Sequence, residues 1–414
     1  MVTRQRLQWE RGPLMKIKLP FGIGNLRYIN WFAFAAMAVL MIVGVCYVYS
    51  ANAFRESPKL QSLYIAQAHL AILCMVIGFV MPLFDYNKIL KFSWFYYLGT
   101  IALLVAVLLL GTSQGMGAKR WVFGIQPSEF AKLATIMLIA KILGRRDASR
   151  DLWDFAFVAL VAIFPVALIF MQPDLGTSII FAPLTAVLLF ASGTAPKTLL
   201  SLVLAGVLSI TVVLGSIALE ASPKTPEPVR KACSVATSFL GNYQKGRLLD
   251  FVFPDRDPLG GGWNRRQSQI AVGSGGLWGK GFLKGDQNIL GYLPQQVSAN
   301  DFIFSVFAEE KGFVGAVSLL VCYGILLLSV LATGVAAPDV SGRLLCVGVA
   351  TLVFCHVFVN IGMTVGMLPV TGLPLPFVSY GRTFMATLGL AMGLVQCVAV
   401  RARTQRKVQD KNGL

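Results

Sequence analysis

Residues 301–332 read DFIFSVFAEEKGFVGAVSLLVCYGILLLSVLA, and this stretch decides the fold. From Phe313 onward it contains no charged residue. The whole stretch is long enough to cross a hydrocarbon core of ~30 Å as one helix. Three acids, Asp301, Glu309 and Glu310, stand at its start. Because ionisable groups at membrane depth are costly and usually functional, these acids need either partners or a task.

The composition of the whole chain is that of a membrane protein. Hydrophobic residues make up 56% of the 414 residues and charged residues only 13%. The mean hydropathy is +0.69, far above ordinary soluble usage. We therefore predict an all-α, polytopic integral membrane protein with about ten transmembrane helices. The candidate spans lie near residues 29–51, 65–84, 93–111, 126–143, 153–171, 174–192, 199–220, 301–332, 341–367 and 380–402.

The placement of Lys and Arg predicts the orientation. With the N-terminus inside, the cytoplasmic segments hold about nineteen basic residues, and the short outer loops hold about four. Those four are Arg55, Lys59, Lys119 and Arg120. We expect both termini to be cytoplasmic, with basic tails at 1–28 and 403–414. The net charge of +17 reflects this bias and attraction to anionic lipid. Nucleic acid is not an expected partner, because no aromatic-and-basic module is present.

One connection, residues 221–300, is far longer than the others. It is polar and rich in glycine, and connections of this length are usually functional or disordered. Aromatic and aliphatic residues recur between its glycines, which favours a folded loop over a disordered one. We predict one membrane domain over residues 1–414, with 221–300 as its large extracytoplasmic loop.

Charged residues gather around the fourth candidate span. Lys119 and Arg120 lie just outside it, and Glu129 and Lys132 lie within it. A spacing of three residues places Glu129 and Lys132 on one helix face, where they can pair. The pair could simply join helices. It could also belong to a cationic mouth that receives an anionic substrate, with Glu129 orienting Lys132.

Two further segments have unusual patterns. In QPDLGTSII (172–180), Asp174 is placed to cap the following helix. In NIGMTVGMLPVTGLPLPFVSYGRTF (360–384), prolines alternate with glycines. That pattern indicates either a non-helical re-entrant segment or an ordinary outer connection. Arg382 would add another positive group near the same outer mouth.

The three acids of residues 301–310 differ in what a purely structural role would require of them. Asp301 could complement the dipole of the helix that follows, with Asn300 or Ser298 as its cap. Glu309 and Glu310 lie about two turns further in, and they need cationic partners or protonation.

Metal chemistry based on histidine or cysteine is not expected. Both histidines, His69 and His356, lie in or near apolar stretches, where a buried and hydrogen-bonded imidazole is the simplest interpretation. The seven cysteines show no Cys-x-x-Cys spacing, and only Cys233 lies in a loop.

Taken together, these segments resemble the shape, elongation, division and sporulation (SEDS) family of membrane glycosyltransferases. The resemblance covers nearly the whole chain, and "QPDLGTS" and "GKGFLKGDQNILGYLP" are more similar to the elongation type, RodA, than to its division paralogue FtsW. The family has ten spans, inside termini and a large outer loop. The motifs that carry the resemblance are GAKRWVFGIQPSEFAKL, QPDLGTSIIF, QSQIAVGSGGLWGKGFLKGDQNILGYLP, DFIFSVFAEEKGFVGA and PVTGLPLPFVSYG.

The resemblance implies polymerisation of lipid II into peptidoglycan strands at the bacterial inner membrane. The implied partners are a class B penicillin-binding protein, which is the transpeptidase, and other elongation-machinery proteins. The motifs imply that Asp301 is catalytic. They also place Lys119, Arg120, Glu129, Lys132, Lys280 and Glu309 around the cavity. Two departures stand out: PQQVSAND replaces the usual Pro-Glu-x-His-Thr-Asp, and Arg382-Thr383 replace Gly-Ser after SYG.

The implied chemistry needs both acid and positive charge. A carboxylate can activate the acceptor's 4-hydroxyl, and direct attack on an α-linked donor inverts the anomeric carbon. The leaving lipid pyrophosphate needs Lys, Arg or a divalent cation such as Mg or Mn. Asp301 could be the base or a metal ligand. The main alternative function is a flippase for lipid-linked precursors; a non-catalytic scaffold would not need converging acids and cations.

Overall fold

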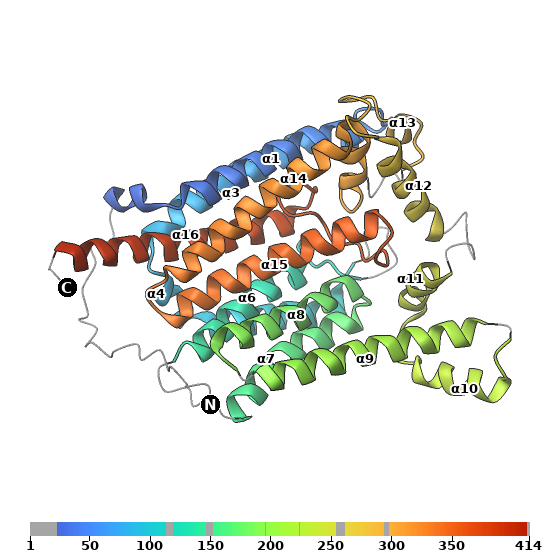
Figure 1. The fold of residues 1–414 in the computed structure, drawn as a ribbon, viewed down its shortest axis with the longest axis horizontal. Coiled ribbons are helices and arrows are strands. Elements are labelled where there is room, and N and C mark those ends of the chain that lie inside the picture. Colours follow the sequence, from blue (N-terminus) through green and yellow to red (C-terminus); the bar gives the residue numbers. More distant parts are fainter. Residues whose placement is uncertain are drawn as a thin grey trace, which may run out of the picture.

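The computed structural model describes residues 23–112, 119–145, 152–194, 196–222, 224–253, 261–293 and 298–411, and almost all of its regular structure is helical (Figure 1). The elements are η1 (Ile23–Tyr28), α1 (Trp31–Asn52), α2 (Pro58–Gln61), α3 (Leu63–Val80), η2 (Met81–Leu83), α4 (Tyr86–Lys91), α5 (Ser93–Leu110), α6 (Pro127–Leu143), α7 (Leu152–Met171), α8 (Leu175–Ser192), α9 (Pro196–Ala221), α10 (Glu227–Ala236), α11 (Asn242–Val252), α12 (Gly261–Ser274), α13 (Asp286–Ile289), α14 (Ile303–Val335), α15 (Val340–Thr364) and α16 (Arg382–Lys411).

The prediction of an all-α polytopic membrane protein is confirmed. Within the described ranges, 9 helical segments are long and apolar enough to cross a membrane. The one remaining predicted span, the fourth in chain order, is α6. It has only 17 residues and carries Glu129, Lys132 and Lys141. Its side chains are nearly all buried, because α6 packs against α5, α7, α8, α15 and α16. A helix shielded by other helices need not be apolar on every face, so we count α6 as the tenth span.

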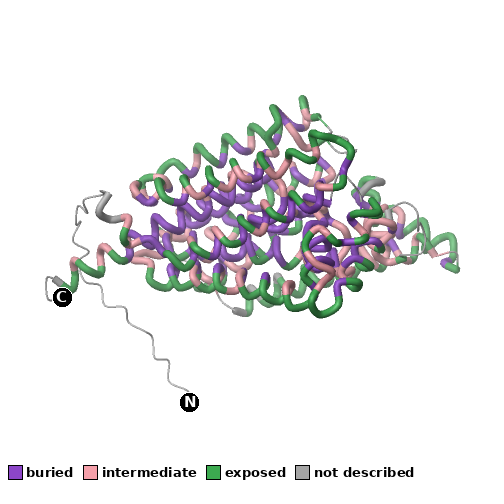
Figure 2. The backbone as a smooth tube through the Cα atoms, turned by 90° about the horizontal axis from the view of Figure 1, so that it is seen from above, coloured by how far each residue is buried: buried purple, intermediate pink, exposed green. Residues whose placement is uncertain are grey.

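The bundle has a buried centre and an apolar exterior. The helix pairs with the most extensive contacts are α3 with α16, α1 with α14, α14 with α15, and α5 with α6. Buried residues run along the middle of these helices, and exposed residues cover the outer sides (Figure 2). Large apolar side chains such as Phe32, Leu109 and Leu328 are exposed there. Exposed apolar faces on long helices are what contact with lipid requires.

The segment between α15 and α16, residues 365–381, is non-helical and enters the bundle. Phe377 and Val378 are fully buried. A Cβ on Gly44 of α1 would lie 2.5 Å from the Phe377 carbonyl oxygen, so α1 needs glycine where it meets this segment. The Tyr323 hydroxyl of α14 donates to the Pro376 carbonyl at 2.6 Å. Because protein lines this irregular backbone, the re-entrant interpretation is supported over an ordinary outer connection.

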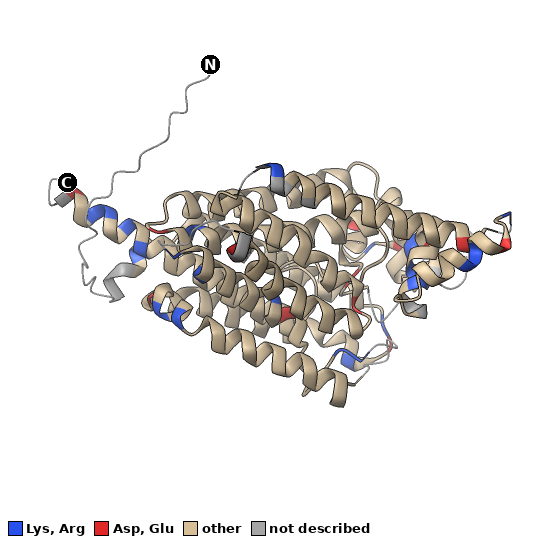
Figure 3. Cartoon of the chain, turned by 90° about the horizontal axis from the view of Figure 1, so that it is seen from below, with Lys and Arg blue, Asp and Glu red and all other residues tan. Residues whose placement is uncertain are grey.

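The described part of 221–300 contains α10, α11, α12 and α13, which lie at one end of the bundle (Figure 1). Basic residues lie mainly at the two ends of the molecule: the C-terminal part of α16 at one end, and α10 to α12 at the other (Figure 3). The basic tails predicted at 1–28 and 403–414 fall partly outside the described residues.

Candidate active site

A cavity of about 170 Å³ lies where the turn before α14, the 365–381 segment and the first residues of α6 and α16 meet. Asp301, Glu129 and three arginines, Arg120, Arg247 and Arg382, line it. The rest of the lining consists of Trp121, Gln126, Asn300, Gly372, Pro374, Tyr380, Gly381, Thr383 and Phe384. The cavity therefore combines carboxylates with several cations.

Asp301 is held by its backbone, which leaves its carboxylate for the cavity. The Asn360 side chain donates to the carbonyl oxygens of Asp301, at 2.8 Å, and Leu373, at 2.7 Å. The N-cap position of α14 is Phe302, and no side chain caps that helix end. The expected cap by Asn300 or Ser298, with Asp301 in the first turn, is therefore wrong. The helix begins two residues later than Asp301, because the preceding turn is tied to the re-entrant segment.

Gly372 keeps space beside the Asp301 carboxylate. Its φ of 75° lies in the left-handed region that glycine adopts without strain. A Cβ there would stand 3.3 Å from Asp301 Oδ2 and 3.5 Å from Arg247 Nη1. A larger residue would press on both functional groups.

The surroundings of Asp301 raise its pKa to about 6. Burial is the main cause, because it disfavours the charged form. Arg247 and Arg120 lower the pKa, and the nearby Asp174 carboxylate raises it further. A carboxyl group with this pKa is largely ionised at neutral pH and is better suited to accept a proton than an ordinary aspartate.

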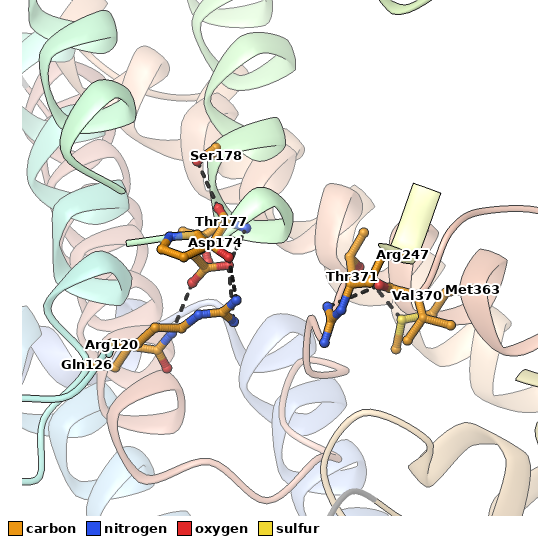
Figure 4. Close-up of polar contacts among 10 residues, drawn as sticks. Arg120, Gln126, Asp174, Thr177, Ser178, Arg247, Met363, Val370 and Thr371 are labelled. Carbon is orange, nitrogen blue, oxygen red and sulfur yellow. Dashed lines mark hydrogen bonds and ion pairs between the residues drawn. The ribbon is translucent and has the colours of Figure 1, made fainter. Parts of the chain in front are cut away.

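Arg120 is fixed to the start of α8. Its Nη2 donates to the Pro173 carbonyl oxygen at 2.6 Å, and its Nη1 lies 3.6 Å from Asp174 Oδ1 (Figure 4). Asp174 also accepts hydrogen bonds from the Thr177 N–H at 3.2 Å and the Thr177 hydroxyl at 2.9 Å. The predicted capping role of Asp174 is confirmed, and the residue holds Arg120 as well.

Arg247 faces the cavity from the outer loop, a position that the sequence did not predict. It lies on α11, and its Nη1 donates to the Val370 carbonyl oxygen at 3.0 Å (Figure 4). Arg382, the first residue of α16, lines the cavity as expected and is exposed. The outer loop 221–300 holds ten Lys and Arg residues, so the sequence alone gives no signal that singles out Arg247.

Glu129 and Lys132 form the predicted ion pair, but only Glu129 lines the cavity. Lys132 Nζ lies 2.8 Å from Glu129 Oε2 and 2.8 Å from His356 Nε2, and its side chain is fully buried. His356 Nδ1 lies 3.1 Å from the Pro374 carbonyl oxygen, and its ring stacks on Phe384. Lys132 thus joins α6 to α15, and His356 is the buried, satisfied imidazole that was expected.

The structure does not bring Lys280 and Glu309 to this cavity. Lys280 Nζ lies 2.7 Å from Glu309 Oε1 and 2.9 Å from Asp286 Oδ2. The same Glu309 oxygen accepts the Gln287 N–H at 3.1 Å. We call these four residues the loop clamp. Lys119 is exposed and does not line the cavity either. Spacing along the chain cannot place such residues, because the outer loop folds back on α14.

The cavity offers limited ligands for a metal. Within the described residues, no group of three or more His, Cys, Asp or Glu side chains could hold an ion. Asp174 is occupied by Thr177 and Arg120, and Glu129 by Lys132. Asp301 is thus the carboxylate best placed to hold one. One carboxylate together with substrate phosphates is a common way to bind Mg²⁺, so the residues fit an ion shared with a substrate.

The departure from the family pattern at PQQVSAND falls partly outside the described residues, at 294–297. At the second departure, Thr383 is buried, and its hydroxyl accepts the Gln126 N–H at 3.2 Å. Arg382 and Thr383 therefore both shape the cavity wall.

Comparison with known proteins gives consistent matches over most of the chain. The family model for FtsW, RodA and SpoVE, described as "Cell cycle protein", matches residues 27–404. The chain is 36% identical to "Peptidoglycan glycosyltransferase MrdB" of Escherichia coli (strain K12), over 90% of this chain and 95% of that protein. It is 31% identical to "Peptidoglycan glycosyltransferase RodA" of Treponema pallidum (strain Nichols), over 92% and 99%.

Solved structures share the fold. One, described as "Structural coordination of polymerization and crosslinking by a peptidoglycan synthase complex", matches with a TM-score of 0.71 and 28% identity. That match covers 90% of this chain and 98% of the other. The crystal structure of Thermus thermophilus "Rod shape determining protein RodA" matches with a TM-score of 0.61 and 27% identity, over 90% and 96%.

Proposed function

This chain belongs to the FtsW, RodA and SpoVE family, and we propose that it is a peptidoglycan glycosyltransferase of the elongation type that polymerises lipid II. The observation that carries the mechanism is the Asp301 carboxylate, with a pKa of about 6, in a cavity that three arginines also line. The names of the relatives support the glycosyltransferase activity, and the matching structure of "Rod shape determining protein RodA" supports a role in rod shape.

In the proposed reaction, Asp301 accepts the proton of the acceptor sugar's 4-hydroxyl. The hydroxyl oxygen then bonds to the anomeric carbon of the donor, and the bond from that carbon to the lipid pyrophosphate breaks. The electron pair leaves with the pyrophosphate, and an α-linked donor becomes a β-linked strand. General-base catalysis of this kind contributes about 10²–10⁴-fold.

The arginines stabilise the leaving group. Arg120, Arg247 and Arg382 line the same cavity as Asp301, so their guanidinium groups can face the charge that develops on the pyrophosphate. Planar guanidinium groups suit phosphate oxygens because they can donate two parallel hydrogen bonds. If Asp301 instead holds a divalent cation, Mg or Mn, together with the pyrophosphate, that ion would neutralise the same charge and another group would accept the proton.

The same relatives support a proposal for the membrane, the orientation and the partner of this chain. We propose that the chain works in the bacterial inner membrane, with both termini in the cytoplasm and the cavity on the outer side. Its partner would be a class B penicillin-binding protein that crosslinks the new strands, together with other elongation-machinery proteins. The solved peptidoglycan synthase complex that shares this fold supports a synthase partner.

The test is strand synthesis by the purified protein with its transpeptidase partner and lipid II, with added Mg²⁺ or with a chelator. We expect polymer, and less of it with the chelator if a cation assists. Lipid II translocation in vesicles is measured with the same preparation. Translocation without polymer, from folded protein bound to its partner, would overturn the polymerase proposal in favour of a flippase.

A further inference from the structure

We propose that a second cavity, between α11 and α12 of the outer loop, binds a sugar unit of the growing glycan strand. This inference rests on the proposed polymerase function and adds a subsite to it. The cavity has a volume of about 310 Å³, at the lower end of the range for ligand pockets. Arg247, Asp250, Phe251, Asn264, Arg265 and Val370 line it.

The lining has the chemistry that a sugar requires. A carboxylate, an amide and guanidinium groups can hydrogen-bond to hydroxyl and acetamido groups. The Arg265 guanidinium lies over the Phe251 ring, 5.1 Å from the ring centroid, and the rest of the Phe251 side chain gives an apolar surface for a sugar ring. The side chains of Asp250, Asn264 and Arg265 are each half-buried, so they are held in place and still reachable. A small number of positioned polar groups on a partly apolar wall is typical of a ligand site.

Arg247 connects this cavity to the reaction site. It lines both cavities, and its bond to the Val370 carbonyl oxygen ties α11 to the re-entrant segment. Arg265 ties the same region together, because its Nη2 donates to the Gly366 carbonyl oxygen at 2.7 Å and its Nη1 to the Phe251 carbonyl oxygen at 3.2 Å. The two cavities are therefore held in a fixed relation by one segment of backbone.

The position of the cavity favours the strand over a lipid-linked monomer. The cavity is built by α11 and α12 of the outer loop, which are not among the candidate membrane-spanning helices, and by Val370 of the re-entrant segment. A monomer enters with its lipid tail in the bilayer, whereas the strand has sugars that extend away from its lipid pyrophosphate. With the reacting anomeric carbon beside Asp301, those more distant sugars would pass Arg247 and reach the second cavity.

The test uses the full chain with its transpeptidase partner. Asn264→Trp fills the cavity, and Ile270→Trp places the same bulk on the exposed side of α12 as the matched control. Formation of the first glycosidic bond and the length of finished strands are measured separately. The quantity compared is the ratio of the elongation rate to the rate of first-bond formation. We expect Asn264→Trp to lower this ratio by about tenfold, which corresponds to ~1.4 kcal/mol of strand binding. The control should keep the wild-type ratio.

Direct binding provides the second measurement. Uncrosslinked tetrasaccharide of alternating N-acetylglucosamine and N-acetylmuramic acid, without lipid or pyrophosphate, is tested by saturation-transfer NMR against the Asp301→Asn protein. We expect binding that Asn264→Trp abolishes and Ile270→Trp retains.

The outcomes separate this inference from the proposed function. Suppose that the wild type makes polymer and that Asn264→Trp has unchanged strand lengths and unchanged tetrasaccharide binding. This result would overturn the strand site and leave the polymerase proposal intact. Equal shortening in both variants would also overturn it. No wild-type polymer, with tetrasaccharide binding that Asn264→Trp abolishes, would support the sugar site and reject the polymerase.

Discussion

Asp301 and Glu309 are acids near the same end of α14, and their surroundings differ in every respect that matters for reactivity. Asp301 precedes the helix, is half-buried and lines a cavity with three arginines. Glu309 lies inside the helix, is fully buried, and is held by Lys280 at 2.7 Å and by the Gln287 N–H at 3.1 Å. A carboxylate whose partners are already in contact stabilises a fold, whereas one that faces a cavity can exchange a proton with a substrate.

The outer loop next to the loop clamp also explains the kink inside α14 at Gly312. Gly312 has a φ of 65° inside the helix, and a Cβ there would lie 2.3 Å from the Gly279 nitrogen. The Phe313 N–H donates to the Gly276 carbonyl oxygen at 2.8 Å, so the outer loop takes up a hydrogen bond that the kinked helix gives up. The charged residues of the loop clamp join the outer loop to α14. They do not line the cavity that Asp301 and the three arginines line.

The largest expected effect comes from Asp301→Asn. If Asp301 is the base, loss of the carboxylate should slow strand synthesis by roughly 10² or more. Thermal stability should change little, because Asp301 does not cap α14. The measurement is lipid II polymerisation by wild type and variant at equal protein and partner levels, with Glu309→Gln as the comparison. Near-normal synthesis by Asp301→Asn would remove it from the catalytic role.

Partial recovery of Asp301→Asn by added divalent cation would instead assign the residue to metal binding. The base role predicts no recovery at any cation concentration, because an amide cannot take the proton. A titration with Mg²⁺ and with Mn²⁺ separates the two roles.

Lys132→Met should be the next most damaging change. It leaves Glu129 buried without its ion pair and His356 without its hydrogen-bond donor, at a cost of about 3–5 kcal/mol in the free energy of unfolding. Lys141→Met is the matched control, because Lys141 lies in the last turn of α6 and donates to the Lys91 carbonyl oxygen. Thermal unfolding in detergent and polymerase activity are both measured. Equal behaviour of the two variants would deny Lys132 a special role.

The pH dependence should reflect Asp301. Its folded pKa of about 6 is raised, so the basic form is lost as the pH falls through 6. The rate of polymerisation should therefore rise from pH 5 to a plateau above pH 7, with a tenfold fall over about one pH unit below 6. Asp301→Asn should lack this step. An inflection in the variant at the same pH would show that another group, in the protein or the substrate, causes it.

The smallest effect is expected from Lys280→Met. The Lys280 side chain is 24% exposed, so solvent screens part of its interaction with Glu309. We expect a loss of about 1 kcal/mol in stability, with activity per folded molecule kept, while Lys119→Met at an exposed site should change neither. Thermal unfolding and strand synthesis are compared. Normal stability with lost synthesis would place Lys280 in the reaction site.

Much of the fold could be predicted from the sequence, because each apolar stretch needs only its own length and composition to become a spanning helix. α6 was also recognised, although its charges and short length weaken that signal. The site was predicted in part. Asp301, Arg120, Glu129 and Arg382 line the cavity, whereas Lys132 lies behind it and Lys280, Glu309 and Lys119 lie elsewhere. Arg247 required the structure, and so did the partners of His356, which are Lys132 and the Pro374 carbonyl oxygen.

The sequence by itself determined the membrane-spanning helices through the length of each apolar stretch, and the charge bias through the placement of Lys and Arg. It also determined the non-helical nature of 365–381 through the alternation of proline and glycine. All three features act locally along the chain. Only the tertiary structure decided which charges meet. Glu309 lies on the helix that Asp301 precedes, yet it pairs with Lys280 from a folded loop, while Asp301 faces Arg247 from another part of that loop. Pairing between distant residues depends on how the outer loop packs on the bundle, and local patterns carry no information on that packing.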